Sequence, residues 1–251
     1  MGLLEVCMQP EYIRGGGVAG YGNRRTMSRE SYFQLSMSRK VVASLTGLGL
    51  AGFVVFHMLG NLQVFEGSDA LNRYASLLRD MPFFLWAARF GLLAVAAVHI
   101  VLVVQLAQRN HRARPVAYAV RKYRQASIGS RTMALSGALL LVFIVFHLLH
   151  QTAGLVDPSV PNRLDAQGHL DVYGKMLHVF RNPLYVAVYV IGQCVLGLHL
   201  SHAVSSCLQT LGLEHAACNR LCKTAGPAVA LLVVIGNLSI IFAVFLGLVH
   251  L

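Results

Sequence analysis

Residues 132–156 read TMALSGALLLVFIVFHLLHQTAGLV and contain no charged side chain. About 20 apolar residues in a helix are enough to cross the roughly 30 Å hydrocarbon core of a bilayer. This stretch is apolar on nearly every helical face, whereas the strands of a membrane barrel alternate apolar and polar residues over about 10 positions. The stretch therefore predicts a membrane-spanning helix, and this helix contains His147 and His150.

Four other uncharged stretches extend this pattern along the chain. They cover residues 41–62, 90–108, 182–213 and 224–251. Only 12% of the 251 residues are charged and 56% are hydrophobic, whereas about 25% of the residues in a typical soluble domain are charged. This composition excludes an intrinsically disordered chain. We expect an all-α fold in which residues 41–251 form a five-helix transmembrane bundle.

The charges are distributed unevenly between the connecting segments. The 21 Lys and Arg outnumber the 10 Asp and Glu, which gives a net charge of +11. Most basic residues lie before residue 41, within residues 109–131 and within residues 214–223. Because cytoplasmic loops are enriched in Lys and Arg, we expect the N-terminus in the cytoplasm and the C-terminus outside. This distribution explains the net positive charge of the chain as a membrane-topology signal, so a nucleic-acid partner is not needed to explain it.

Residues 1–40 lack the apolar core and the cleavage site of a signal peptide. We interpret them as a flexible cytoplasmic tail. In the last basic segment, His215, Cys218 and Cys222 have a loose metal-ligand spacing. A structural zinc site usually needs a fourth protein ligand, and none is evident nearby, so the role of these three residues stays open.

Histidines inside the apolar stretches are the most informative residues. Ionisable side chains at membrane depth are costly and usually functional. Counted from the cytoplasmic helix ends, His57 and His147 lie about 24 Å into the membrane and His99 and His199 about 15 Å. Two pairs at two depths, each divided between two helices, fit two bis-histidine haems. A haem at His57 and His147 would lie nearer the outside, and one at His99 and His199 nearer the cytoplasm.

Two further histidines leave the ligand assignment open. His150 lies three residues after His147, and His202 lies three residues after His199, so each pair shares a helix face. The spare histidine in each pair could bind a haem propionate or a quinone, or it could face a neighbouring helix. Small residues near these positions would let a macrocycle approach the backbone, although tight helix packing uses the same residues. They are Gly60, Gly137, Gly192 and Gly197.

Several motifs together resemble a known family. Residues 52–65 read GFVVFHMLGNLQVF, and residues 72–75 read NRYA. DVY at residues 171–173 is followed by FRNPLY at 180–185, and HLSH at 199–202 is followed by QTLG at 209–212. From residue 37 to its end, the chain resembles the cytochrome b membrane anchor of bacterial succinate dehydrogenase and fumarate reductase. The type it is similar to is a single subunit with five helices and two haems.

The resemblance implies a function in electron transfer. The four haem ligands of the family carry over onto His57, His99, His147 and His199, with the first and third on the outer haem. Such an anchor passes electrons between an iron–sulfur subunit and a membrane quinone. For this chain, we expect the quinone to be menaquinone. The anchor holds the iron–sulfur subunit and a flavoprotein at the cytoplasmic face of the bacterial inner membrane. The basic segment 109–131 is either a docking surface for these subunits or a topology signal alone.

The resemblance also points to a quinone site near the outside. Relatives carry an acidic residue there, but the equivalent position falls near Asn72, which is not acidic. Glu66 and Asp69 lie nearby and could shuttle protons to a quinone oxygen, and Arg73 completes the set of candidates. Some relatives carry a glutamate two residues before the fourth ligand, where this chain has Gly197. This difference argues against transmembrane proton conduction by that route.

Two other functions fit parts of the pattern. One is a dihaem anchor for a formate dehydrogenase or a hydrogenase, which has the same mechanism and different partner subunits. The other is a haem-free transporter in which the histidines relay protons. Transporters often contain two related halves, and the sequence shows no such repeat.

Overall fold

The computed structural model describes residues 29–112, 128–157, 163–213 and 219–249. The chain divides into two units, Met1–Ser36 and Met37–Leu251, and the following account concerns the second. In the first unit, residues 29–36 are helical. The expected flexible tail of residues 1–40 thus falls partly outside the described residues, and its last part, from residue 29, belongs to a helix.

The described part of the chain is all-α, as predicted. It contains no strand, and Leu164 and Leu170 form only an isolated bridge. Five segments are long and apolar enough to cross a membrane, which confirms the five predicted spans. The helices that contain them are α1 (Arg29–Asn61), α3 (Pro82–Arg112), α4 (Ile128–His147), α6 (Pro183–Thr210) and α7 (Asn219–Phe245).

The helix α3 runs beyond both ends of the uncharged stretch from which it was predicted, whereas α6 lies within its stretch. The sequence predicted a span at residues 90–108, whereas α3 extends from Pro82 to Arg112. A bilayer core needs only about 20 residues of helix, so the helix ends continue to the level of the headgroups. Arg109 and Arg112 lie in the last turn of α3, where charged side chains can reach water.

Four shorter elements join the spans. They are the 3₁₀-helix η1 (Leu62–Glu66), the helix α2 (Ser68–Arg79), the π-helix η2 (Leu148–Thr152) and the helix α5 (Val172–Arg181). The side chain of Asp171 caps α5 by accepting a hydrogen bond of 2.7 Å from the Gly174 N–H. Asn182 caps α6 through the Leu184 N–H at 2.9 Å. Such caps satisfy N–H groups that have no partner within the helix.

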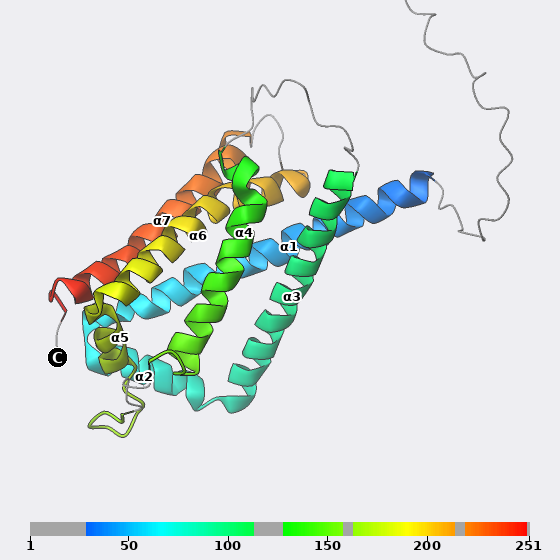
Figure 1. Cartoon of the computed structure of the whole chain (residues 1–251). Coiled ribbons are helices and arrows are strands. Elements are labelled where there is room, and N and C mark those ends of the chain that lie inside the picture. The colour runs from blue at the N-terminus through cyan, green and yellow to red at the C-terminus, as the bar shows by residue number, and fades with distance from the viewer. Residues whose placement is uncertain (1–28, 113–127, 158–162, 214–218, 250–251) are drawn as a thin grey trace, which may run out of the picture. The chain divides into compact units, whose positions relative to one another are not determined.

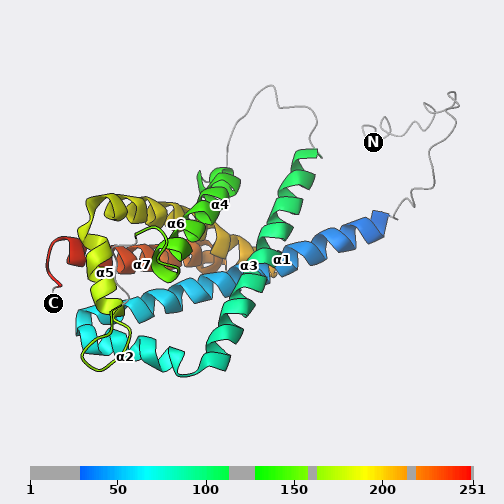
Figure 2. The same cartoon turned by 60° about the horizontal axis from the view of Figure 1, so that its bottom comes forward.

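The long helices α6 and α7 run side by side (Figures 1 and 2), and α4 packs against α6. Between α6 and α7, the Asn237 amide donates a hydrogen bond of 2.9 Å to Gln193 Oε1. Polar bonds of this kind help hold helices together in a membrane. Met58 of α1 and Val233 of α7 are both almost fully buried in one apolar cluster. This packing connects the first span to the last two.

Asn72 connects α2 to the start of α5 at one end of the spans. Its side chain is only 1% exposed. Its amide nitrogen donates to Asp165 Oδ2 and to Asp171 Oδ1, both at 3.2 Å, and its oxygen accepts from the Tyr173 N–H at 3.0 Å. All three bonds join segments about 100 residues apart in sequence. Asn72 is therefore a structural connection and not a solvent-facing quinone ligand.

Candidate functional site

The structure brings His57 of α1 and His147 of α4 together. Their ring centroids are 5.9 Å apart, with the ring planes at 86°. A first-row metal binds an imidazole nitrogen at about 2 Å, so two imidazoles on opposite sides of one metal place their ring centroids about 6 Å apart. At this separation the two imidazoles would have room to hold one metal ion between them.

His99 of α3 and His199 of α6 are the second predicted pair. His99 lies beside Ala43 and Thr46 of α1, and His199 lies beside Ser136 of α4. Both side chains are partly buried, and both rings lie beside a glycine of another helix. The structure thus brings His57 and His147 into ring contact, whereas the pairing of His99 with His199 stays a prediction.

Hydrogen bonds fix the orientation of the His99 ring. Its Nδ1 lies 3.1 Å from the main-chain oxygen of Ala43 and 3.2 Å from Thr46 Oγ1. A carbonyl oxygen only accepts, so His99 carries its proton on Nδ1 and donates it to Ala43. The other ring nitrogen, Nε2, makes no hydrogen bond to the described residues and keeps its lone pair.

The same reasoning fixes the tautomer of His199. Its Nδ1 lies 3.1 Å from Ser136 Oγ, and that hydroxyl group donates its single proton to Met133 O at 3.1 Å. Ser136 must then accept from His199 Nδ1–H, which leaves the lone pair on Nε2. Histidines that bind metals usually donate their second ring N–H to a protein oxygen in this way.

The His57–His147 pair is fixed differently. Asn61 Nδ2 lies 3.2 Å from His57 Nε2, and because an amide NH₂ group donates, Nε2 of His57 holds the lone pair. Tyr189 Oη lies 3.4 Å from His147 Nδ1 and 3.3 Å from His150 Nδ1. One tyrosine hydroxyl group thus joins the two histidines of α4 and η2.

The structure distinguishes His147 from His150. The π-helix η2 starts immediately after His147, and its wider turn changes the direction of the side chains that follow. His150 is 1% exposed and packs on Tyr185, with ring centroids 4.3 Å apart. Its Nε2 has no hydrogen-bond partner among the described residues. His147 therefore faces His57, whereas His150 is enclosed by aromatic rings of α6.

Two glycines allow histidine rings to approach a neighbouring helix. A Cβ atom on Gly47 of α1 would lie 3.0 Å from His99 Cε1, and one on Gly137 of α4 would lie 3.5 Å from His199 Cε1. Gly137 was among the small residues that the sequence singled out, but Gly47 was not. Gly60, Gly192 and Gly197 instead lie against Tyr74, Phe143 and Val234, so these glycines serve helix packing.

The predicted quinone candidates lie on the surface. Glu66 ends η1, Asp69 lies in the first turn of α2, and Arg73 lies one turn later. All three are exposed. His202 is partly buried and lies one turn after His199. His215 and Cys218 lie outside the described residues. Cys222 is buried and donates to Leu213 O at 3.4 Å.

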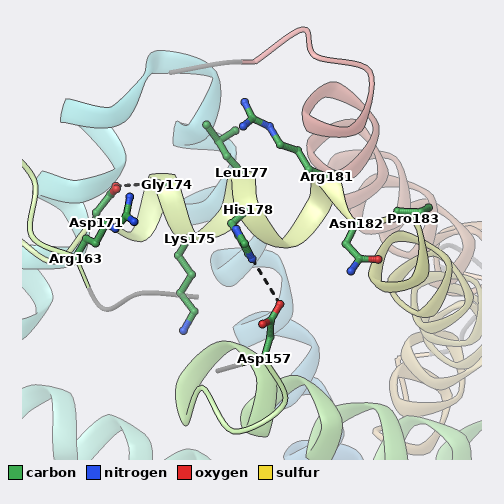
Figure 3. A pocket seen from close by; sticks show the side chains of 10 residues that line it. All are labelled: Asp157, Arg163, Asp171, Gly174, Lys175, Leu177, His178, Arg181, Asn182 and Pro183. Carbon is green, nitrogen blue, oxygen red and sulfur yellow. Dashed lines mark hydrogen bonds and ion pairs between the residues drawn. The ribbon is translucent and has the colours of Figure 1, made fainter. Parts of the chain in front are cut away.

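A polar cavity that sequence reasoning missed lies between α5 and the end of η2. Its volume is about 780 Å³. Figure 3 shows Lys175 and His178 leaving α5 on the side of Asp157. His178 Nε2 lies 3.6 Å from Asp157 Oδ2, and Lys175 Nζ donates to Gln151 O at 2.6 Å. Burial and the charge of Arg79 lower the pKa of Lys175.

These groups could exchange protons with a ligand in the cavity. Lys175 and His178 share α5, but Asp157 comes from a separate segment, so no single pattern in the sequence marks all three. Among the described residues, no group of three or more His, Cys, Asp and Glu could hold a bare metal ion. Two histidines could hold a haem without such a group, because the porphyrin supplies the other ligands of its iron.

No family model, curated protein sequence or solved structure matches the chain.

Proposed function

We propose that this chain is the membrane cytochrome b subunit of a succinate:quinone oxidoreductase. In this role it binds two b-type haems and transfers electrons between an iron–sulfur subunit and a membrane quinone, most consistent with menaquinone. The dicarboxylate chemistry belongs to the partner flavoprotein. The proposal combines the family resemblance of the sequence with the geometry of the four histidines.

One observation carries the haem proposal. Neighbouring groups hold the lone pair on Nε2 in His99 and His199, where Nε2 makes no hydrogen bond to the described residues. In His57 the lone pair is also on Nε2, but it accepts from the Asn61 amide, which would have to turn away for Nε2 to bind a metal. Nε2 is the nitrogen farther from the backbone, and it can reach a metal that lies between two helices. A histidine that served only helix packing would need no such common tautomer. The fourth ligand, His147, has its Nδ1 beside Tyr189 and its ring at the expected separation from His57.

The residues of the chain have three tasks in this function. When bound, a haem accepts and releases one electron, at a potential set by its axial ligands and their surroundings. Ala43, Ser136 and Tyr189 orient the ligand histidines. In a bilayer, the apolar helices together with the lipid around the exposed His57 would exclude water from both pairs. This would lower the local dielectric constant and make the hydrogen bonds of the ligands matter more for the potential.

Quinone reduction also requires protons. The cavity beside α5 presents Lys175, His178 and Asp157, and the exposed residues Glu66, Asp69 and Arg73 lie on η1 and α2. Both sets of residues lie at the same end of the membrane spans, which is the end where α4 continues into the π-helix η2. Carboxylates and imidazoles can pass protons to a quinone oxygen within hydrogen-bond reach. We place the quinone site at this end of the membrane domain.

The partners and the location follow from the same proposal. The flavoprotein and the iron–sulfur subunit would bind at the cytoplasmic face of a bacterial inner membrane, at the end of the spans nearer His99 and His199. Arg109, Arg112 and Arg131 border this face, and the segment between them contains the expected docking surface. Residues 113–127 of that segment lie outside the described residues.

Purification with native partners tests the proposal. The tagged full-length chain is isolated from membranes of the cell that produces it, and its subunits and optical spectrum are analysed. We expect a subunit with covalent flavin and b-type haem that succinate reduces. A molybdenum or nickel subunit would instead identify a formate dehydrogenase or hydrogenase anchor. A folded preparation without haem would favour a histidine proton relay.

A further inference from the structure

A second cavity lies at the ends of α1 and α3. Its volume is about 240 Å³, and its lining contains three arginines, two glutamines and no acidic residue. The lining residues are Arg39, Gln105, Gln108, Arg109 and Arg112. Neither Arg39 nor Arg112 forms a salt bridge with another described residue. Arg39 and Arg112 therefore bring two positive charges to the cavity that no salt bridge of the described residues neutralises.

The position of this cavity is set by the two spans that form it. Arg39 lies two residues after Met37, where the first span begins, and Arg112 is the last residue of the second span. Side chains at the ends of membrane spans lie at the level of the lipid headgroups. This level is the same for either orientation of the chain in the membrane.

The face of α3 that forms the cavity continues as an apolar stripe. Gln105, Gln108 and Arg112 are separated by three and four residues, and Val101 and Val98 continue the same spacing. Residues at this spacing share one helix face. Val98 is 44% exposed and Val101 is 52% exposed. Positive charge and amide groups at the headgroup level are thus followed by exposed apolar side chains toward the membrane interior.

We propose that this cavity binds one anionic phospholipid. Arg39 and Arg112 contact its phosphate, the glutamine amides donate to the headgroup oxygens, and an acyl chain lies along Val101 and Val98. Basic pockets between membrane helices are suited to anionic headgroups. An acidic segment of a partner protein, or free phosphate, would use the arginines but not the apolar stripe. The proposal does not depend on haem binding.

Lipid binding to the purified protein tests this proposal. The full-length chain, with the subunits that accompany it, is delipidated in detergent and titrated with phosphatidylglycerol, phosphatidylcholine or inorganic phosphate. Native mass spectrometry counts the retained lipid. We expect tight retention of phosphatidylglycerol alone. Arg39→Gln and Arg112→Gln should each weaken its binding about fivefold, because one cationic side chain near an anionic headgroup contributes that much.

Matched variants separate this site from general charge effects. Arg220→Gln removes an exposed arginine near the start of α7, at the same end of the spans, and should leave binding unchanged. Arg112→Lys keeps the charge and should retain binding, which also controls for folding. Equal retention of phosphatidylcholine, or equal loss in Arg220→Gln, would overturn the proposal. Loss of a partner subunit with lipid retained in Arg39→Gln would also overturn it in favour of an acidic protein segment.

Discussion

The two histidine pairs are held by different kinds of neighbour. In the His99–His199 pair, a main-chain oxygen and a serine in the middle of α1 and α4 fix the rings. In the His57–His147 pair, one ring bonds to Asn61 on the next turn of its own helix, and the other shares the Tyr189 hydroxyl group with His150. The first arrangement is rigid, whereas the second can redistribute its hydrogen bonds. The rigid pair would suit a site that receives electrons, and the adaptable pair would suit a site that passes electrons on together with protons.

The largest expected effect comes from removing one ligand of each pair. We expect His99→Leu and His57→Leu each to lower the haem content from two per chain to about one, with a different low-spin signal lost in each variant. The measurement is haem content combined with electron paramagnetic resonance spectra. His202→Leu is the matched control and should retain both haems, because this histidine lies one turn from the pair. Loss of the same signal in both variants would contradict the separate pairs.

Disruption of Asn72 should destabilise the end of the molecule near His57 and His147. Asn72→Leu removes three hydrogen bonds and leaves a buried Tyr173 N–H and two carboxylates without this partner. We expect the free energy of unfolding to fall by about 3 kcal/mol, with faster proteolysis in the segment 163–171. Thermal unfolding and limited proteolysis measure these effects. Arg73→Gln, an exposed neighbour, should change stability by less than about 0.5 kcal/mol.

Exchange of the orienting residues should affect one haem at a time. Tyr189→Phe removes the hydrogen bond to His147, and Ser136→Ala removes the one to His199. Loss of such a supporting bond typically weakens metal binding about tenfold. We therefore expect weaker retention and a shifted midpoint potential for one haem in each variant, measured by redox titration. Tyr185→Phe, which retains the ring against His150, is the control. A shift of both haems by either variant would contradict two independent sites.

The smallest expected effect depends on pH and concerns Asp165. Partial burial alone would raise the pKa of Asp165, but hydrogen bonds from the His169 and Gln167 N–H groups and from Asn72 lower it below the ordinary value of 3.8. Because folding lowers this pKa, the stabilisation is complete above pH 3.8 and disappears as the pH falls through the lower value of the folded state. The protection of residues 163–171 from hydrogen exchange, measured relative to the intrinsic rate at each pH, should therefore fall below pH 4. Asp165→Asn should reduce this dependence, whereas Asp80→Asn, at an exposed position, should not.

The sequence predicted the spans, and it placed His57 and His147 at one depth, because both depend on simple distances along a helix. The uncharged stretches mark where charge is excluded, and the depth of His57 and His147 follows from the rise per residue. The same reasoning could not choose between His147 and His150, because their separation by three residues assumes a regular α-helix. The π-helix η2 begins between them and changes the direction of the second ring.

Other parts of the site depend on contacts between distant segments. Tyr189, Gly47 and Asn72 have no pattern that marks them, since each is defined by a partner between 39 and 101 residues away. The helices α2 and α5 are short and amphipathic, so the search for uncharged stretches did not find them. The resemblance placed a quinone residue near Asn72, and the structure shows instead that this side chain is fully used in joining α2 to α5.

The haem content of the purified full-length chain tests the central claim most directly. A pyridine haemochrome assay on a folded preparation gives the number of b-type haems per chain. We predict two haems, because each of the two proposed histidine pairs would hold one. Less than one haem per chain in such a preparation would contradict the account.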